Sequence, residues 1–317
     1  MISRRYIRVK VMQTLYVLET MECDTIEQEQ KQGQKILDDK LKRSFDLFAI
    51  CLLYIVRVAQ YAEISAQQKA NKYLPTNEDL NVNIKIAQNT FMLELLANDS
   101  LQKRVKESHL EQHISQDWIK KMFQSLTISE PYKEYISTIE RNNKAEKAIF
   151  RHIWFGVLLQ NEKMVEYFDD EMPGWEDDAE LMVNMMENFF HMTAFPDFGQ
   201  LLSFEKTKYA NDLLATTVDK KDFCMDLIKP KLQNWDADRV ATIDLILLCM
   251  GITELVFFET IPTKVTINEF IEISKMYSTR QSGPFINGVL DNIYKELERE
   301  NKIKKVDLPN KKTQHEV

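Results

Sequence analysis

Glycine and proline are scarce in this chain of 317 residues. The seven glycines leave a gap from Gly33 to Gly156, and the eight prolines leave one from Pro75 to Pro131. Because the turns of sheet proteins favour these two residue types, their distribution favours long helices over strands. We therefore predict an all-α protein, and a hydrophobic content of 44% is enough for a sizeable core.

A long apolar run is missing too. The longest, from Leu47 to Val56, is flanked by charged residues and falls short of the roughly 20 residues that a membrane-spanning helix needs. At the start of the chain, Arg4 and Arg5 are followed by intermixed apolar and basic residues, which is not the pattern of a signal peptide. We expect a cytoplasmic protein that does not associate with membranes.

The sequence also lacks metal-binding and redox motifs. Its four cysteines include no Cys-x-x-Cys pair and are expected to be reduced structural thiols. His109 and His113 stand four residues apart around Glu111, but this is not the His-Glu-x-x-His order and no third ligand is near in sequence. We predict no metal site and interpret these residues as a solvated helix face.

Motifs for catalysis are missing as well. We find no Gly-rich phosphate loop, no Gly-x-Ser-x-Gly and no nucleophile with a nearby base in the sequence. Carboxylates are plentiful, but the sequence does not single out any pair of them as acid and base. We predict no catalytic residue and no cofactor, and therefore a protein that is not an enzyme.

Positive charge is outnumbered, with 41 Lys and Arg against 49 Asp and Glu, a net charge of −8. This balance excludes a protein that binds nucleic acid over its whole surface. The charge is uneven, however, because Arg4, Arg5 and Arg8 all precede the first acidic residue, Glu19. The basic start of the chain indicates a confined site for a polyanion.

The first helix is predicted from residue 4 to 19. At ~100° per residue, Arg5, Arg8 and Tyr16 fall within a sector of roughly 80°, and apolar residues such as Ile7 lie on the opposite side. One face is expected to pack and the other to present cations and an aromatic ring. Arginine holds phosphates and unpaired bases stack on aromatic rings, so this face is a candidate RNA-binding surface.

Further helices are predicted along the whole chain. A polar stretch from residue 23 to 34 leads into a long helix that ends before Pro75. The others are predicted at 84–96, 99–110, 115–126, 131–142, 144–160, 179–192, 206–217, 220–233 and 238–258. Two more follow toward the C-terminus, joined by a polar turn, because residues 267–271 and 286–297 repeat the apolar spacing of helix faces. Gly288 lies inside the second of these, so we expect a ligand or a neighbouring backbone to approach it closely.

Four segments resemble the NusB family of antitermination factors. They are residues 3–16 (SRRYIRVKVMQTLY), 209–214 (YANDLL), 239–255 and 264–291, the last containing FINGVLD. The resemblance is continuous from about residue 206 to 299. It implies a NusB-like helical bundle made of the first helix, residues 1–20, and residues 206–300. Residues 21–205 would then be a helical insertion of unknown role, and 301–317 a charged, disordered tail.

The resemblance also implies a function. Members of the family bind boxA-type single-stranded RNA together with the ribosomal protein NusE, and support processive transcription of ribosomal RNA operons in the RNA polymerase antitermination complex. Asp244 falls where the family places an acidic contact to NusE. The RNA-binding residues implied by position are Arg4, Arg5, Arg8, Gln13, Tyr16, Lys264, Phe285 and Asn287.

Two other interpretations remain open. In the first, the chain is a helical protein-interaction scaffold that does not bind RNA. In the second, it is an accessory RNA-binding module related to ribosomal RNA methyltransferases, although the sequence lacks the Gly-rich turn and strand-rich region of a cofactor domain.

Overall fold

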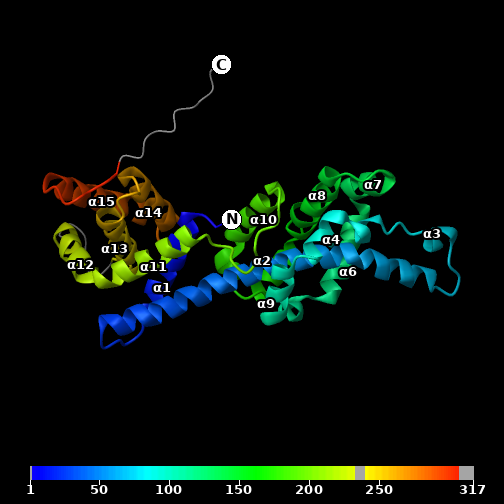
Figure 1. Cartoon of the computed structure of the whole chain (residues 1–317), viewed down its shortest axis with the longest axis horizontal. Coiled ribbons are helices and arrows are strands. Elements are labelled where there is room, and N and C mark those ends of the chain that lie inside the picture. Colours follow the sequence, from blue (N-terminus) through cyan, green and yellow to red (C-terminus); the bar gives the residue numbers. More distant parts are fainter. Residues whose placement is uncertain (1, 233–239, 307–317) are drawn as a thin grey trace, which may run out of the picture. The chain divides into compact units, whose positions relative to one another are not determined.

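The computed structural model describes residues 2–232 and 240–306, and over these residues it contains helices and no strand (Figure 1). The all-α prediction is confirmed. The chain divides into two compact units. Unit 1 consists of Ile2 and Leu41–Leu202, and unit 2 consists of Ser3–Lys40 together with the chain from Ser203 onward. One long helix, α2 (Ile26–Ala70), contributes its first turns to unit 2 and the remainder to unit 1.

Unit 2 contains the two ends of the sequence that resemble NusB. Its remaining elements are α1 (Arg4–Leu18), α11 (Phe204–Asp219), α12 (Lys221–Ile228), the 3-10 helix η4 (Lys229–Leu232), α13 (Thr242–Phe257), α14 (Thr263–Tyr277) and α15 (Ser282–Arg299). The predicted start of α13 at residue 238 lies outside the described residues.

The helix α13 is the centre of unit 2. It is apolar on all sides, as expected of a helix surrounded by others, and every residue from Ile246 to Leu255 is buried. Helices α1, α11, α12, α14 and α15 all pack against it. The packing of unit 2 therefore depends on which side chains this one helix directs toward each neighbour.

Two glycines show where helices of unit 2 come close together. At Gly251 of α13, a Cβ atom would lie 3.0 Å from both terminal methyl carbons of Leu290 and 3.5 Å from the ring of Phe270. At Gly288 of α15, a Cβ atom would meet nothing within 4 Å. The prediction of a packed neighbour at Gly288 is wrong, and the close approach occurs at Gly251 instead.

Unit 1 is built around the apolar part of α2. Its other elements are α3 (Asn77–Leu80), η1 (Lys85–Gln88), α4 (Thr90–Leu96), α5 (Asp99–Glu107), η2 (Leu110–His113), α6 (Gln116–Ile128), α7 (Glu130–Ser137), α8 (Asn143–His152), the π-helix η3 (Ile153–Leu158), α9 (Glu162–Glu171) and α10 (Trp175–His191). Among the described residues, α2 is the one helix long and apolar enough to cross a membrane. However, 78% of its most apolar stretch is buried inside the protein, as in a core helix.

Several helix boundaries differ from prediction. The long helix begins at Ile26, inside the stretch expected to be polar and irregular. The segment between the helices predicted at 144–160 and 179–192 contains an unpredicted helix, α9, whose N-cap residue Asn161 accepts a hydrogen bond from the backbone N–H of Met164. Gly174, with φ of +85°, then separates α9 from α10. The apolar residues Met164 and Phe168 are buried on one face of α9.

The predicted disordered tail begins at residue 301, and its first residues are placed. The Lys305 ammonium donates hydrogen bonds to the backbone oxygens of Glu254 and Phe258, 3.0 and 2.8 Å away, and the N–H of Val306 donates to the oxygen of Glu259. Burial lowers the pKa of Lys305. Residues 307–317 lie outside the described residues.

A buried ion pair joins α1 to α13. The guanidinium of Arg8 donates from Nε and Nη2 to the two carboxylate oxygens of Glu254, over 2.8 and 2.7 Å, and the residues are 1% and 0% exposed. Burial disfavours the charged guanidinium, but the hydrogen bonds to Glu254 and its negative charge outweigh burial and raise the pKa of Arg8. The expectation that Arg8 lies on the exposed face of the first helix is wrong. Arg8 is buried because it pairs with Glu254, a carboxylate far away in sequence that no helical pattern in α1 reveals.

Other hydrogen bonds complete the environment of Glu254. The hydroxyls of Tyr209, on α11, and Thr266, on α14, donate to its two oxygens over 2.5 and 2.7 Å. Each carboxylate oxygen therefore accepts two hydrogen bonds. Burial and the Glu254 carboxylate raise the pKa of Tyr209, which keeps this hydroxyl protonated as a donor. A buried charge is tolerated only when it is paired and hydrogen-bonded in this way.

The two glycines give the first testable prediction. Changing Gly251→Val places methyl groups against Leu290 and Phe270, and we expect the free energy of unfolding to fall by about 1–3 kcal/mol because the core is overpacked. At Gly288 there is room for a methyl group, so Gly288→Ala should raise the free energy of unfolding by roughly 0.5–1 kcal/mol. Urea unfolding followed by circular dichroism measures both, and equal stability of the two variants would contradict this packing.

The ion pair gives the second prediction. Glu254→Gln removes the carboxylate that accepts hydrogen bonds from the buried Arg8 guanidinium and, among the described residues, leaves only Glu269, 3.5 Å from Nη1, as a countercharge, so we expect it to lower the free energy of unfolding by about 3 kcal/mol. The double change Arg8→Met with Glu254→Gln removes the unpaired charge and should recover part of this loss. Arg4→Met, which removes a solvent-exposed pair, is the control and should cost no more than about 1 kcal/mol. A Glu254→Gln variant as stable as this control would refute the structural role of the pair.

Candidate nucleic-acid interface

Each arginine at the start of α1 lies against a carboxylate from a distant segment. Arg4 pairs with Glu205 of α11. Arg5 donates to both oxygens of Glu269 of α14, each over 2.9 Å, and the hydrogen bonds to this carboxylate raise the pKa of Arg5. With the buried Arg8 pair, three positive charges meet three negative ones. The charge excess predicted at this end of the chain is therefore largely neutralised within unit 2.

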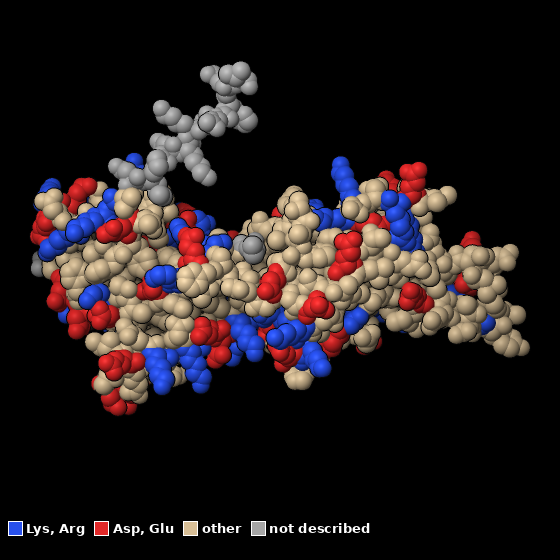
Figure 2. All heavy atoms as spheres, in the orientation of Figure 1, with Lys and Arg blue, Asp and Glu red and all other residues tan. Residues whose placement is uncertain are grey.

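Two of these arginines still reach solvent. The side chains of Arg4 and Arg5 are 41% and 40% exposed, so their outer N–H groups are accessible to a phosphate. On the face drawn in Figure 2, basic and acidic side chains are interspersed on both units and form no continuous basic patch. Any nucleic acid bound here would be held by a few contacts.

Arg5 and Tyr16 share one face of α1. They are eleven residues apart, which at ~100° and ~1.5 Å per residue places them about 20° and 16 Å apart along the helix. Tyr16 is 46% exposed, which leaves part of its ring accessible for stacking. Between them, the Oε1 atom of Gln13 is buried and has no hydrogen-bond partner among the described residues. Arg4 and Gln13 lie ~100° and ~80° from Arg5 around the helix, on opposite sides of it. We call Arg5 and Tyr16, together with the flanking Arg4 and Gln13, the α1 stripe.

The predicted contacts from the C-terminal helices stand on α14 and α15. Lys264 and Asn287 are exposed, whereas Phe285 is 5% exposed and belongs to the core. Lys264 makes no hydrogen bond or ion pair within the described part of the chain. A ring this deeply buried cannot offer a face to a base, so among these residues Lys264 and Asn287 are the accessible ones.

Helix α13 separates the α1 stripe from the start of α15. Asp244 and Gly251 face α15, since they contact Ser282 and Leu290, and they lie within ~20° of each other on α13. The residues of α13 that line a hollow with Leu15 of α1 lie about 120–180° away on the same helix. Tyr16 and Phe285 thus belong to two helices, α1 and α15, that pack against different faces of α13.

Asp244 is buried rather than presented to a partner. It is 6% exposed, and its Oδ2 accepts a hydrogen bond from the hydroxyl of Ser282 over 2.7 Å. Ser282 is the first residue of α15, where a carboxylate is favoured by the helix dipole. The other oxygen, Oδ1, is buried and has no partner among the described residues. This arrangement holds the start of α15 against α13.

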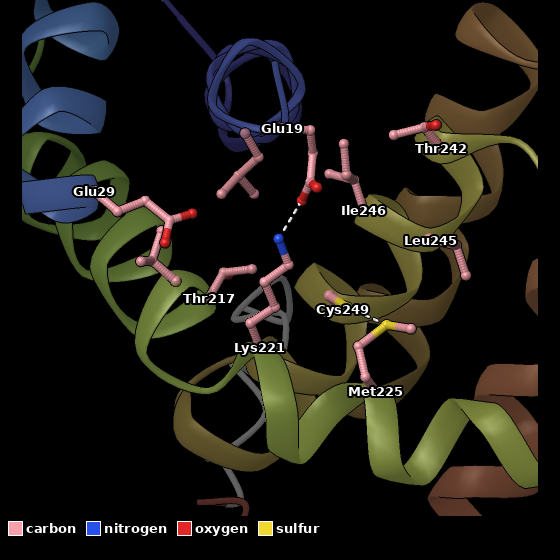
Figure 3. A pocket seen from close by; sticks show the side chains of 11 residues that line it. Glu19, Glu29, Thr217, Lys221, Met225, Thr242, Leu245, Ile246 and Cys249 are labelled. Atoms are coloured by element: carbon pink, nitrogen blue, oxygen red, sulfur yellow. Dashed lines mark hydrogen bonds and ion pairs between the residues drawn. The ribbon is translucent and has the colours of Figure 1, made fainter. Parts of the chain in front are cut away.

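A small hollow lies beside the last turns of α1 (Figure 3). Its volume is about 150 Å³, and the ammonium of Lys221 lies 2.6 Å from the carboxylate of Glu19 at its mouth. Leu15, Ile246 and Cys249 are among the side chains that line it. The hollow is smaller than the roughly 300–1,000 Å³ of typical ligand sites, so we assign it no ligand.

Sequence reasoning missed the residues that pair with the arginines. These residues are far from α1 in sequence, and several stand in segments that resemble NusB. They are Glu205, Glu254, Glu269, Tyr209 and Thr266. Helical periodicity identifies the face on which a residue lies but not the charge opposite it, so no signal in one sequence shows these pairs.

Comparison with known proteins assigns the chain to a family. A sequence model described as the NusB family matches residues 184–295. The transcription antitermination protein NusB of Salinibacter ruber is 40% identical over 97 residues, which cover 31% of this chain and 61% of that protein. The protein of the same name from Thermodesulfovibrio yellowstonii is 42% identical over 88 residues, which cover 28% and 58%. This chain thus spans about three fifths of the length of these two relatives.

A third relative is matched over more of its length. The transcription antitermination protein NusB of Methylacidiphilum infernorum is 37% identical over 105 residues, which cover 33% of this chain and 73% of that protein. A solved structure of T. maritima NusB shares 30% identity over 38% of this chain and 78% of its own, with a TM-score of 0.29. With one relative matched over nearly three quarters of its length, the chain belongs to the NusB family.

Proposed function

We propose that this protein is a cytoplasmic, non-enzymatic transcription antitermination factor that binds boxA-type RNA together with NusE. The relatives to which it is similar are named transcription antitermination proteins. The observation that carries the RNA-binding part is the α1 stripe, where accessible Arg4 and Arg5 share a helix with an exposed tyrosine ring. Phosphate contacts from arginine and base stacking on an aromatic ring are the two means of holding an unpaired strand.

The internal ion pairs explain why a partner is needed. RNA affinity grows with the number of phosphates neutralised. Arg4 and Arg5 already contact Glu205 and Glu269, so a phosphate must compete with these carboxylates. With a net charge of −8, the whole protein repels RNA as well. NusE would supply the missing contacts, and within this chain the exposed Lys264 and Asn287 would form a second, separate contact.

Asp244 has an indirect part in this proposal. Because it is buried against Ser282, it shapes the surface at the start of α15 without touching NusE. Unit 2 would be the NusB-like domain, and residues 41–202 of unit 1 the inserted segment, which is shorter at both ends than the 21–205 expected from the sequence. A protein scaffold without RNA binding is the second candidate, and a pull-down of NusE before and after RNase treatment separates the two. Under the leading proposal, RNase weakens the complex.

The α1 stripe gives a prediction on RNA affinity. In the presence of NusE, Tyr16→Ala should weaken binding of a boxA-type RNA by about 1–3 kcal/mol because one base loses its stacking partner. Arg5→Ala should reduce the slope of log affinity against log salt concentration by about the amount that corresponds to one phosphate contact. Fluorescence polarisation at several salt concentrations measures both. Lys35→Ala, at an exposed cation of α2 outside the stripe, is the matched control and should bind like the original protein.

The partner gives a separate prediction. A titration of boxA-type RNA without NusE should show weak binding, and addition of NusE should raise the affinity by tenfold or more, which corresponds to about 1.4 kcal/mol or more. An unrelated RNA of the same length should gain much less. Equal affinities for the two RNAs, unchanged by NusE, would contradict the proposed function.

A further inference from the structure

Unit 1 contains a hollow that the NusB-like function does not use. It has a volume of about 410 Å³, within the roughly 300–1,000 Å³ range of small-molecule sites. Its walls are α4, the first turns of α8, and the end of α10 with the loop that follows. Every residue that lines it belongs to unit 1.

Aromatic rings form the apolar wall of this hollow. The ring of Phe91 lies 5.1 Å from that of Phe195 and 5.8 Å from that of Phe189, measured between centroids. Phe189 is buried, whereas Phe91 and Phe195 are half-buried and line the open space. Two adjacent, partly open rings are a surface on which a flat heterocycle can stack.

Two lysines of α8 stand at the edge of the same hollow. Lys147 donates to the backbone oxygen of Met192 over 2.5 Å and lies 5.3 Å from the centre of the Phe91 ring, so it holds the loop against α8. Lys144, one turn earlier on the same face, is exposed and makes no hydrogen bond or ion pair with the described part of the chain. Glu94 is the one carboxylate on the wall, so the lining carries an excess of positive charge.

We infer that this hollow binds a nucleotide, with the base on the rings of Phe91 and Phe195 and the phosphate at Lys144. A purely apolar ligand would leave Lys144 without a role. The lining offers a metal ion only Glu94 and His191 as charged or imidazole ligands, and Nε2 of His191 already lies 3.1 Å from a carboxylate oxygen of Glu187. A base with an attached phosphate matches both the rings and the cations. That the nucleotide belongs to the same RNA strand rests on the proposed function, and a free nucleotide is the other source.

Photocrosslinking tests the inference at the site itself. A single-stranded RNA containing 4-thiouridine is irradiated with the full-length protein and NusE, and the crosslinked peptides are identified by mass spectrometry. We expect crosslinks to peptides that contain Phe91 or Phe195, separate from those of the α1 stripe. Titration with AMP by calorimetry is the second arm, and binding of AMP without crosslinks from RNA would identify a free nucleotide as the ligand.

Two variants connect the signal to the hollow. Lys144→Glu should reduce the crosslinks in unit 1 severalfold, or AMP affinity about tenfold, because it repels the phosphate. Phe195→Leu retains an apolar side chain but removes the stacking ring and should reduce both signals. Lys163→Glu, at an exposed lysine of α9, reverses the same charge away from the hollow and should have no effect. Melting temperatures confirm that the variants fold.

The outcomes separate this inference from the proposed function. If crosslinks form at Phe91 or Phe195 but not at Tyr16, RNA binding by the α1 stripe is refuted and the nucleotide site is supported. Crosslinks at the stripe, with none in unit 1 and no AMP binding, would overturn the nucleotide site and leave the proposed function intact. Equal effects of Lys144→Glu and Lys163→Glu would overturn it as well.

Discussion

The buried pair of Arg8 and Glu254 is the interaction on which the arrangement of unit 2 depends. One carboxylate accepts hydrogen bonds from α1, α11 and α14, and its own backbone oxygen accepts another from Lys305. Four other segments thus meet at one residue of α13. A buried charge is stable only while these partners stay in place, so the site requires the first helix to pack with helices that come some two hundred residues later. The inserted segment must leave unit 2 and return to it.

The same pairing limits how the protein can bind RNA. An arginine engaged with a carboxylate offers a phosphate a smaller gain than a free one, since the existing contact is partly lost. The exposed pair of Arg4 costs little free energy to rearrange, as is usual for surface ion pairs. The part-buried, bidentate pair of Arg5 with Glu269 costs more, and the fully buried pair of Arg8 costs the most. The three arginines look equivalent in the sequence but divide into one structural residue and two that can exchange partners.

Sequence alone predicted the all-α class, the first helix almost to the residue, and the family. Periodicity is a local property, and it succeeds where one apolar face decides the structure, as in α1 and α15. It failed for Arg8, which is buried because the carboxylate of Glu254 balances its charge. It also failed for Gly288, which has no neighbour close to it among the described residues, whereas the close contact between helices is at Gly251. It failed as well for Phe285, which was expected to contact RNA and is buried in the core. Each failure concerns which surfaces meet, and that is decided by three-dimensional packing.

An acidic protein can bind RNA well without a large basic patch if it has several weak sites. Once a flexible strand is held at one site, binding at the next becomes intramolecular, and the effective concentration is set by the length of strand between them. The α1 stripe supplies a ring and two exchangeable arginines, and the hollow of unit 1 supplies two rings and a free lysine. Neither has the charge to hold RNA tightly in isolation. An insertion with a nucleotide site would therefore increase affinity for longer unpaired strands while leaving the surface acidic, which keeps unrelated nucleic acids away.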